Sequence, residues 1–249
     1  MIAPEGIAEV RSADRLGTLV HEAATRSGWT LSDGDVVVVA QKIVSKAEGR
    51  IARLDAMTPS PLARDLAAAT RKDPRLVQLV LDQSDEVLRA RAGVMVVAHR
   101  RGWVMANAGI DQSNVPDADD DVVLLLPENP DASARALRDE LAALTGADVC
   151  VVIADSFGRA WRMGVVGVAI GASGFETVEC WRGRRDRQGR ELAHTEVARA
   201  DEIAAAAGLL MGQADEGRPL VLMRGLTVRS SETADASDLV RPAAEDMFR

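Results

Sequence analysis

The stretch GDVVVVAQKIVSKAEGR, which covers residues 34–50, decides the fold class of this chain. Gly34 and Asp35 are typical turn residues, and the apolar, β-branched run Val36–Ala40 is typical of a strand buried on both faces. The run becomes polar at Gln41. Because ligands bind at the carboxyl ends of strands in open α/β sheets, this stretch predicts a central strand with a ligand site at its end.

Helical and strand patterns alternate on either side of this stretch. Periodic apolar residues, first-turn prolines and terminal glycines predict helices at 13–28, 61–70, 74–84, 131–145 and 195–211. Apolar runs between turn residues predict strands at 94–98, 103–106, 122–126, 149–154, 164–174 and 220–223. The alternation has no repeat period, which indicates an α/β or mixed α+β class. We also expect Asp131 to cap its helix and residues 229–238 to form a loop.

No proline-rich or glycine-rich linker divides the sequence. Residues 1–249 are therefore expected to form one domain, with intermixed lobes rather than two separate ones. Residues 116–121 are acidic and are expected to form a surface loop or a hinge. Since the chain stops at Arg249, no fused C-terminal domain is expected.

Composition excludes several classes of protein. The 249 residues are 47% hydrophobic and 27% charged, which is typical of a soluble globular protein and excludes a wholly disordered chain. No apolar run approaches the ~18 residues of a membrane span, and the N-terminus does not resemble a secretory signal, so a cytoplasmic protein is expected. A net charge of −8 disfavours nucleic acid as a partner. The two cysteines suggest structural thiols, and the three histidines lack zinc-ligand spacing.

Two acidic clusters follow predicted strands. Asp111 and Asn114 lie in a glycine-containing loop at residues 107–114, and Asp155 and Ser156 follow the strand at 149–154. Their hard oxygen atoms suit Mg²⁺ or Mn²⁺, while Arg159 and Arg162 could hold phosphate oxygens. The alternatives are an Asx turn at Asp111 and a capping Asp-Ser pair with surface arginines at 155–162.

Three further clusters carry charge or glycine. Lys46 could neutralise a phosphate, or Lys42, Lys46 and Arg50 could form a solvated face. Five arginines within residues 181–192 form a positive segment that suits a phosphorylated or polycarboxylate substrate, or a solvated loop. Glycines in the segment 211–219 permit close approach to a ligand, or form a helix C-cap and a connecting loop.

Seven strings carry a resemblance to a known family: GDVVVVAQKIVSKAEGR (34–50), SDEVLR (84–89), NAGIDQSNV (107–115), LLPENPDASA (125–134), ADSFGRAWRMGVVGVAIG (154–171), GRELAHTEVARADEIAAAAGLLMG (189–212) and VLMRGL (221–226). Together they resemble the coenzyme F420-0:L-glutamate ligases, also called F420 γ-glutamyl ligases. The resemblance implies a distinctive mixed α/β fold, neither P-loop nor Rossmann, in a cytoplasmic homodimer. It also implies GTP-dependent addition of one glutamate to F420-0, then of a second, γ-linked glutamate, with Mg²⁺ or Mn²⁺ and often K⁺.

The family's functional positions transfer to numbered residues of this chain. The implied metal ligands are Asp111, Asp155, Ser156 and Gln213, and the implied catalytic residues are Asp111, Asp155 and Lys46. The implied GTP contacts are Ile7, Ala8, Glu9, Val10, Gln41, Lys42, Lys46, Asn114, Met211, Gly212, Gln213, Ala214, Asp215, Glu216, Gly217 and Arg218. Charge alone suggests substrate contacts at Arg159, Arg162, Arg184 and Arg185.

The sequence departs from the family pattern at three positions. Ala8 stands where the family usually has proline, and Ala13 where it usually has glycine. Gln213 is neutral where relatives can carry glutamate, which predicts weaker metal binding from that change. Two alternatives to a glutamate ligase of F420-0 remain: a metal-dependent phosphatase or phosphotransferase, and a ligase of the same family with another acid acceptor. A non-catalytic nucleotide-binding protein is a third.

Overall fold

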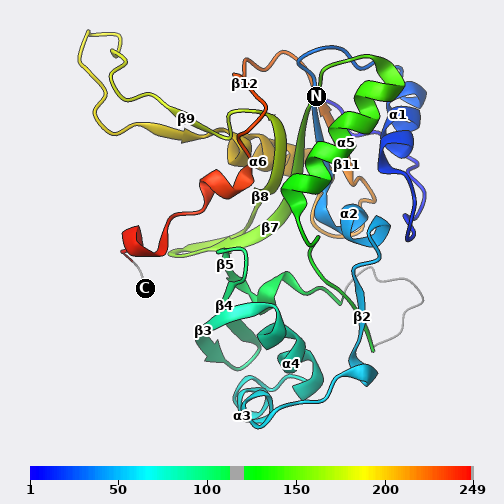
Figure 1. The fold of residues 1–249 in the computed structure, drawn as a ribbon, viewed down its shortest axis with the longest axis vertical. Helices are drawn as coiled ribbons and strands as arrows, with labels where there is room; N and C mark the ends of the chain where they lie inside the picture. The colour runs from blue at the N-terminus through cyan, green and yellow to red at the C-terminus, as the bar shows by residue number, and fades with distance from the viewer. Residues whose placement is uncertain (113–120, 248–249) are drawn as a thin grey trace.

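A five-stranded mixed sheet organises the larger body of the protein (Figure 1). A computed structural model describes residues 1–112 and 121–247. The strand order is β11-β1-β7-β8-β12, and of the pairings only β1 with β7 is parallel. The strands are β1 (Val36–Ala40), β7 (Cys150–Arg159), β8 (Arg162–Phe175), β11 (Leu220–Met223) and β12 (Ser230–Ser231).

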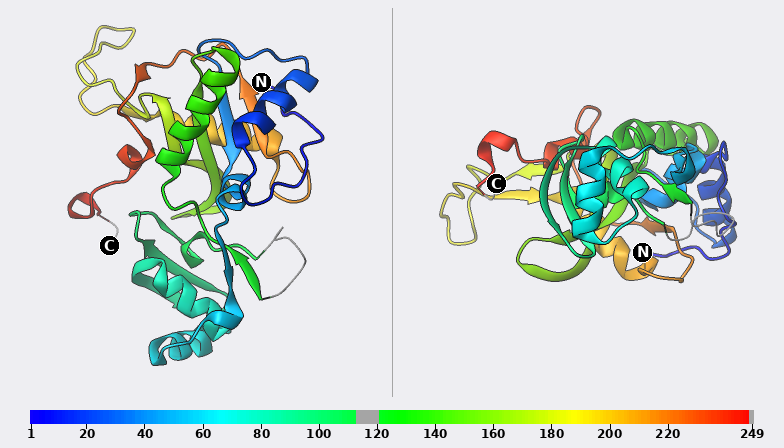
Figure 2. Two further views of the ribbon diagram at one scale, coloured as in Figure 1. Left: turned by 45° about the vertical axis from the view of Figure 1, so that its right-hand side comes forward. Right: turned by 90° about the horizontal axis from the view of Figure 1, so that it is seen from below.

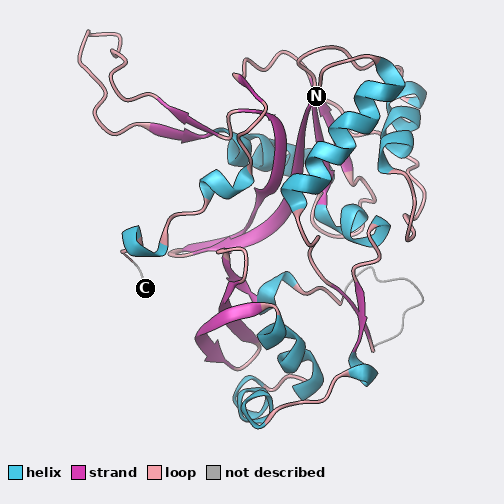
Figure 3. Ribbon diagram, in the orientation of Figure 1, coloured by secondary structure: helices cyan, strands magenta, loops and turns pink. Residues whose placement is uncertain are grey.

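Helices cover both faces of this sheet, as Figures 1 and 3 show. They are α1 (Leu16–Arg26), α2 (Gln41–Ala47), α5 (Pro130–Thr145) and α6 (Arg199–Met211). Successive strand side chains point to opposite faces. Val37 and Val39 therefore pack with the core under α1 and α5, while Val36 and Val38 pack with the core under α6. All four valines are buried, which is why this strand is apolar throughout.

A smaller body holds the described residues between α2 and α5 (Figure 2). Its antiparallel sheet, β3-β4-β5, packs against two helices. Each helix has proline as its first residue and an N-cap side chain, Ser60 or Asp73, that accepts a hydrogen bond from a backbone N–H of the first turn. The elements are α3 (Pro61–Thr70), α4 (Pro74–Asp82), β3 (Ser84–Arg91), β4 (Val94–His99) and β5 (Val104–Ala106). The pair β2 (Ile51–Arg53) and β6 (Val122–Leu124) lies where the chain leaves and re-enters.

The mixed α/β class is confirmed, and several element boundaries are corrected. The strand predicted to stop at residue 154 continues to Arg159, because β7 and the long strand β8 form a hairpin and pair up to that residue. The helix predicted from residue 195 begins at Arg199, because β10 (Glu196–Ala198) pairs with β9 (Val178–Cys180). These two strands carry an arm that projects from the main sheet (Figure 1). The acidic stretch 116–121 lies outside the described residues except for Asp121.

Two further details differ from expectation. Asn129, not Asp131, caps α5, because its side chain accepts from the Ala132 N–H. Ala13 has φ 69°, in the left-handed region that favours glycine, which matches the glycine that the family pattern places there. The tail predicted as a loop contains β12 and a short 3₁₀ helix at Ala236–Leu239.

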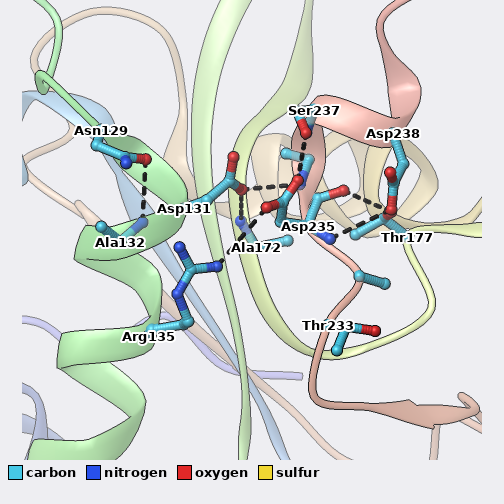
Figure 4. A network of polar contacts seen from close by, with 12 residues as sticks. Asn129, Asp131, Ala132, Arg135, Ala172, Thr177, Thr233, Asp235, Ser237 and Asp238 are labelled. Atoms are coloured by element: carbon cyan, nitrogen blue, oxygen red, sulfur yellow. Dashed lines mark hydrogen bonds and ion pairs between the residues drawn. The ribbon is translucent and has the colours of Figure 1, made fainter.

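Asp131 ties the C-terminal segment to the main sheet instead of capping a helix (Figure 4). Its Oδ1 accepts the Ala172 N–H at 2.9 Å and the Ala236 N–H at 2.8 Å, and the residue is only 6% exposed. Burial raises the pKa of this carboxyl, and the two N–H donors oppose that rise only in part. The carboxyl is therefore useful as an acceptor but costly as a charge.

This geometry predicts opposite behaviour for two replacements of Asp131. Asp131→Ala leaves two buried N–H groups unpaired and is expected to cost about 2–4 kcal/mol of unfolding free energy. Asp131→Asn keeps the accepting oxygen and is expected to stay within about 1 kcal/mol of wild type. Because the native carboxyl holds its proton to higher pH than the unfolded one, wild-type stability falls as pH rises through that window. Urea unfolding from pH 4 to pH 7 checks both predictions. Equal unfolding free energies for the two variants would contradict the role of the accepting oxygen. The same change of unfolding free energy with pH in wild type and Asp131→Asn would contradict the role of the proton.

Candidate active site

A cavity of about 640 Å³ lies at the carboxyl end of β1 and beside the middle of β7, where the parallel pairing of the two strands ends. The N-terminal segment 7–10 and the loop that follows α6 form further parts of its lining. The cavity therefore forms where the sequence predicts a ligand site, next to Ala40 and Ala154, which are paired neighbours in the parallel strands. Its described lining includes residues 7–10 and 211–218, together with Gln41, Lys42, Lys46, Asp111, Asp155 and Ser156.

The helix α2 delivers two lysines to the cavity. It begins directly after β1, so Lys42 and Lys46 lie one turn apart on one side of the helix. The Nζ of Lys42 lies 2.5 Å from Oδ2 of Asp111. Lys46 is nearly buried and forms an ion pair with Glu9 of the N-terminal segment. Gln41 is also buried, and its side-chain oxygen accepts from Ser45 Oγ at 3.0 Å.

A β-bulge lies just before Asp155. Ile153 pairs with Gly171 whereas Ala154 pairs with Ala169, so Ile170 is an extra residue in β8. Near this bulge the Ala169 N–H donates to Asp201 Oδ1 at 2.9 Å. A bulge bends its strand and redirects the side chains that follow, and here it precedes the residues that reach the cavity.

Close packing of α6 against β8 positions the side of the cavity that is formed by α6 and the loop after it. A Cβ atom on Gly167 would lie 2.4 Å from the carbonyl oxygen of Ala204, so only glycine permits this approach. The loop after α6 turns at Gly212, where φ is 76°. Within the loop, Glu216 accepts the Ala214 N–H at 2.8 Å, and Gln213 Oε1 accepts from Ser156 Oγ at 2.8 Å. The last bond joins the loop to β7.

The electrostatics of the cavity centre on Asp155. The pKa of this carboxyl is raised to about 6, chiefly by burial and also by the negative charge of Asp111, while the Ser156 N–H and Lys42 oppose the shift. Two carboxylates close enough to repel each other in a half-buried site favour a cation between them.

The donor set fits a divalent cation that prefers oxygen ligands. Asp111 and Asp155 supply carboxylates, Ser156 a hydroxyl and Gln213 an amide oxygen, and all four residues line the cavity. Within residues 1–112 and 121–247 there is no group of three His, Cys, Asp or Glu side chains that could hold a metal by itself. Mg²⁺ is usually bound by one or two carboxylates together with phosphate oxygens and water, so the set fits a metal that arrives with a phosphorylated ligand.

Comparisons with known proteins show the family to which the chain belongs. A family model described as F420-0:Gamma-glutamyl ligase matches residues 6–225. The chain belongs to this family. It is accordingly a ligase that forms an amide bond.

Curated relatives of this ligase match it over nearly their whole length. A protein from Methanothermobacter thermautotrophicus named "Coenzyme F420:L-glutamate ligase" is 44% identical, covering 100% of this chain and 98% of the relative. Proteins of the same name from Methanopyrus kandleri and Haloarcula marismortui are 46% and 41% identical, covering 97% and 100% of this chain and 94% and 95% of the relatives.

The remaining candidate residues of this F420-0:gamma-glutamyl ligase family member lie elsewhere. Asn114 falls outside the described residues. Arg159 and Arg162 flank the turn between β7 and β8, and Arg184 and Arg185 lie on the arm, so none of these four lines the cavity. Among the residues that the structure describes, Nη1 of Arg159 is a buried atom with no hydrogen-bond partner.

Several lining residues escaped the sequence analysis as site residues. They include Ile43, Val165, Gly167, Ala204 and Gly208. The apolar run at 164–174 predicted a strand, but it did not show that α6 packs closely against this strand. No helix within the described ranges has both the length and the apolar character needed to cross a membrane.

Proposed function

We propose that this ligase adds L-glutamate to coenzyme F420-0 with GTP as the phosphoryl donor, and then adds a second, γ-linked glutamate. The first round converts F420-0, glutamate and GTP to F420-1, GDP and phosphate, and the second converts F420-1 to F420-2. The observation that carries the proposal is the meeting of Asp111 and Asp155 with Lys42 and Lys46 in one cavity of a family member. The names of the relatives support the substrates.

The proposed reaction proceeds through an acyl phosphate. A free carboxylate is inert toward an amine, so the acceptor carboxylate first attacks the γ-phosphorus of GTP and GDP leaves. The glutamate amine then attacks the acyl carbon, loses a proton, and expels phosphate as the amide bond forms. Phosphoryl transfer depends mainly on positioning and on neutralisation of charge.

Several residues of the cavity, and Arg159 outside it, have proposed roles. Asp111, Asp155, Ser156 and Gln213 would hold one or two Mg²⁺ or Mn²⁺ ions, which neutralise charge on the phosphate oxygens when bound. Lys46 binds phosphate, and the segments 7–10 and 211–218 enclose the nucleotide. The unpaired guanidinium nitrogen of Arg159 supports a role in holding an anionic group of the acceptor. K⁺ as an additional ion, a cytoplasmic location and a homodimer complete the proposal.

Mass spectrometry tests the proposed function. F420-0 incubated with the enzyme, GTP, Mn²⁺ and glutamate is expected to give a ladder of products separated by one glutamyl residue. GDP formation is expected to require glutamate, and ATP in place of GTP serves as the nucleotide control. Phosphate release that is independent of glutamate would instead identify a phosphatase, and product formation with a different acid would identify another acceptor.

A further inference from the structure

The cationic side chains of the cavity are each held by a carboxylate of the same chain. Lys42 pairs with Asp111 at 2.5 Å, Lys46 pairs with Glu9, and Arg218 pairs with Glu5 at 2.7 Å. The described lining holds five acidic and three basic side chains, a net charge of −2. A triphosphate that arrives without a metal would meet paired lysines and an excess of negative charge, which opposes its binding.

The Lys42–Asp111 pair differs from the other two. Both of its side chains are sheltered, at 31% exposed for Lys42 and 27% for Asp111. In the other two pairs the carboxylate is exposed, at 60% for Glu9 and 74% for Glu5, although Lys46 itself is only 7% exposed. The sheltered pair is less screened by water and salt. Asp111 is also the only carboxylate of the three pairs in the candidate metal set, and both it and Lys42 act on Asp155.

A divalent cation and the ammonium of Lys42 therefore compete for the same carboxylate. A carboxylate that already binds an ammonium is a poorer metal ligand, because its charge and lone pairs are engaged. A divalent ion interacts with Asp111 and Asp155 together and carries twice the charge of the lysine. The lysine side chain is a flexible four-carbon stem, so its ammonium can leave one anion for another.

We propose that Lys42 exchanges its partner when the metal and the nucleotide bind: it holds Asp111 in the empty cavity, and the divalent ion releases it for the phosphate groups. The cavity then selects the metal–nucleotide complex over the free nucleotide, and each ligand strengthens the binding of the other. This inference rests on the proposed function, because it requires a metal and a nucleotide at this site.

Binding of Mn²⁺ without nucleotide tests the exchange, measured by isothermal titration calorimetry or by the electron paramagnetic resonance signal of free Mn²⁺. Lys42→Gln is expected to bind Mn²⁺ about three- to tenfold more tightly than wild type, because the competing ammonium is gone. The same variant is expected to bind GDP more weakly at saturating Mn²⁺. Lys42→Arg retains a cation beside Asp111, so its Mn²⁺ affinity is expected to remain near that of wild type.

Lys46→Gln is the matched control. It removes the same charge from the same cavity, but its partner Glu9 is not a proposed metal ligand. Its Mn²⁺ affinity is expected to remain near wild type while its GDP affinity falls. Equal or weaker Mn²⁺ binding by Lys42→Gln, with wild type binding both Mn²⁺ and GDP, would overturn the exchange alone. Failure of wild type to bind Mn²⁺ and GDP would overturn the proposed function and the exchange with it.

Discussion

Asp155→Asn is expected to reduce glutamate addition to F420-0 by more than about a hundredfold, because loss of even an indirect metal partner costs 10–100-fold and Asp155 is a proposed direct ligand. The variant removes a negative charge from the cavity lining that Asp155 shares with Asp111, so the cavity attracts a divalent ion less strongly. Product formation at saturating GTP, Mn²⁺ and glutamate measures the effect.

The control for this prediction is Asp139→Asn. Asp139 lies exposed on α5 and does not line the cavity, so this variant loses the same charge away from the site. Its turnover is expected to match wild type. Near-normal turnover of Asp155→Asn in the same assay would remove Asp155 from the mechanism.

Gly171→Ala is expected to lower the free energy of unfolding by about 3 kcal/mol, because overpacking a tight core contact costs 1–3 kcal/mol and here the obstacle is backbone. A Cβ atom at this position would lie 2.4 Å from the carbonyl oxygen of Pro130 and 2.5 Å from its carbonyl carbon. Pro130 opens α5, so relief requires the whole first turn of that helix to move away from β8. Urea unfolding monitored by circular dichroism measures the loss.

Gly158→Ala provides the comparison for Gly171→Ala. Gly158 also lies in the β7–β8 hairpin, but a Cβ atom there would meet nothing within 4 Å. Its unfolding free energy is expected to remain within about 0.5 kcal/mol of wild type. Similar stabilities for the two variants would show that α5 does not sit against β8 as described.

Strong local signals made part of the fold predictable. The strands Val36–Ala40 and Leu220–Met223 and the helix Pro61–Thr70 have the predicted bounds, since an apolar run or a capped proline defines each end. β3 was not predicted: it is polar and largely exposed, and it forms because β4 lies beside it. Asp131 was misassigned as a cap because its true partners, Ala172 and Ala236, are distant in sequence.

The candidate site, too, could be predicted from the sequence only in part. Polar residues just after apolar strands identified Gln41, Lys42, Asp155 and Ser156 as neighbours of a ligand, and the cavity lies there. The ion pair between Lys42 and Asp111 could not be predicted from their spacing in the sequence, because it depends on the path by which the chain passes from the smaller body back towards α2. That contact, which underlies the exchange proposed above, becomes visible only in three dimensions.

The most direct test of the central claim is a crystal structure with GDP and Mn²⁺, in which the anomalous scattering of manganese locates the ion. The account predicts a manganese peak bound by the carboxylates of Asp111 and Asp155, with the phosphates of GDP beside it and Lys42 no longer in contact with Asp111. A nucleotide bound outside this cavity, or manganese held by other residues while the two aspartates remain without an ion, would contradict it.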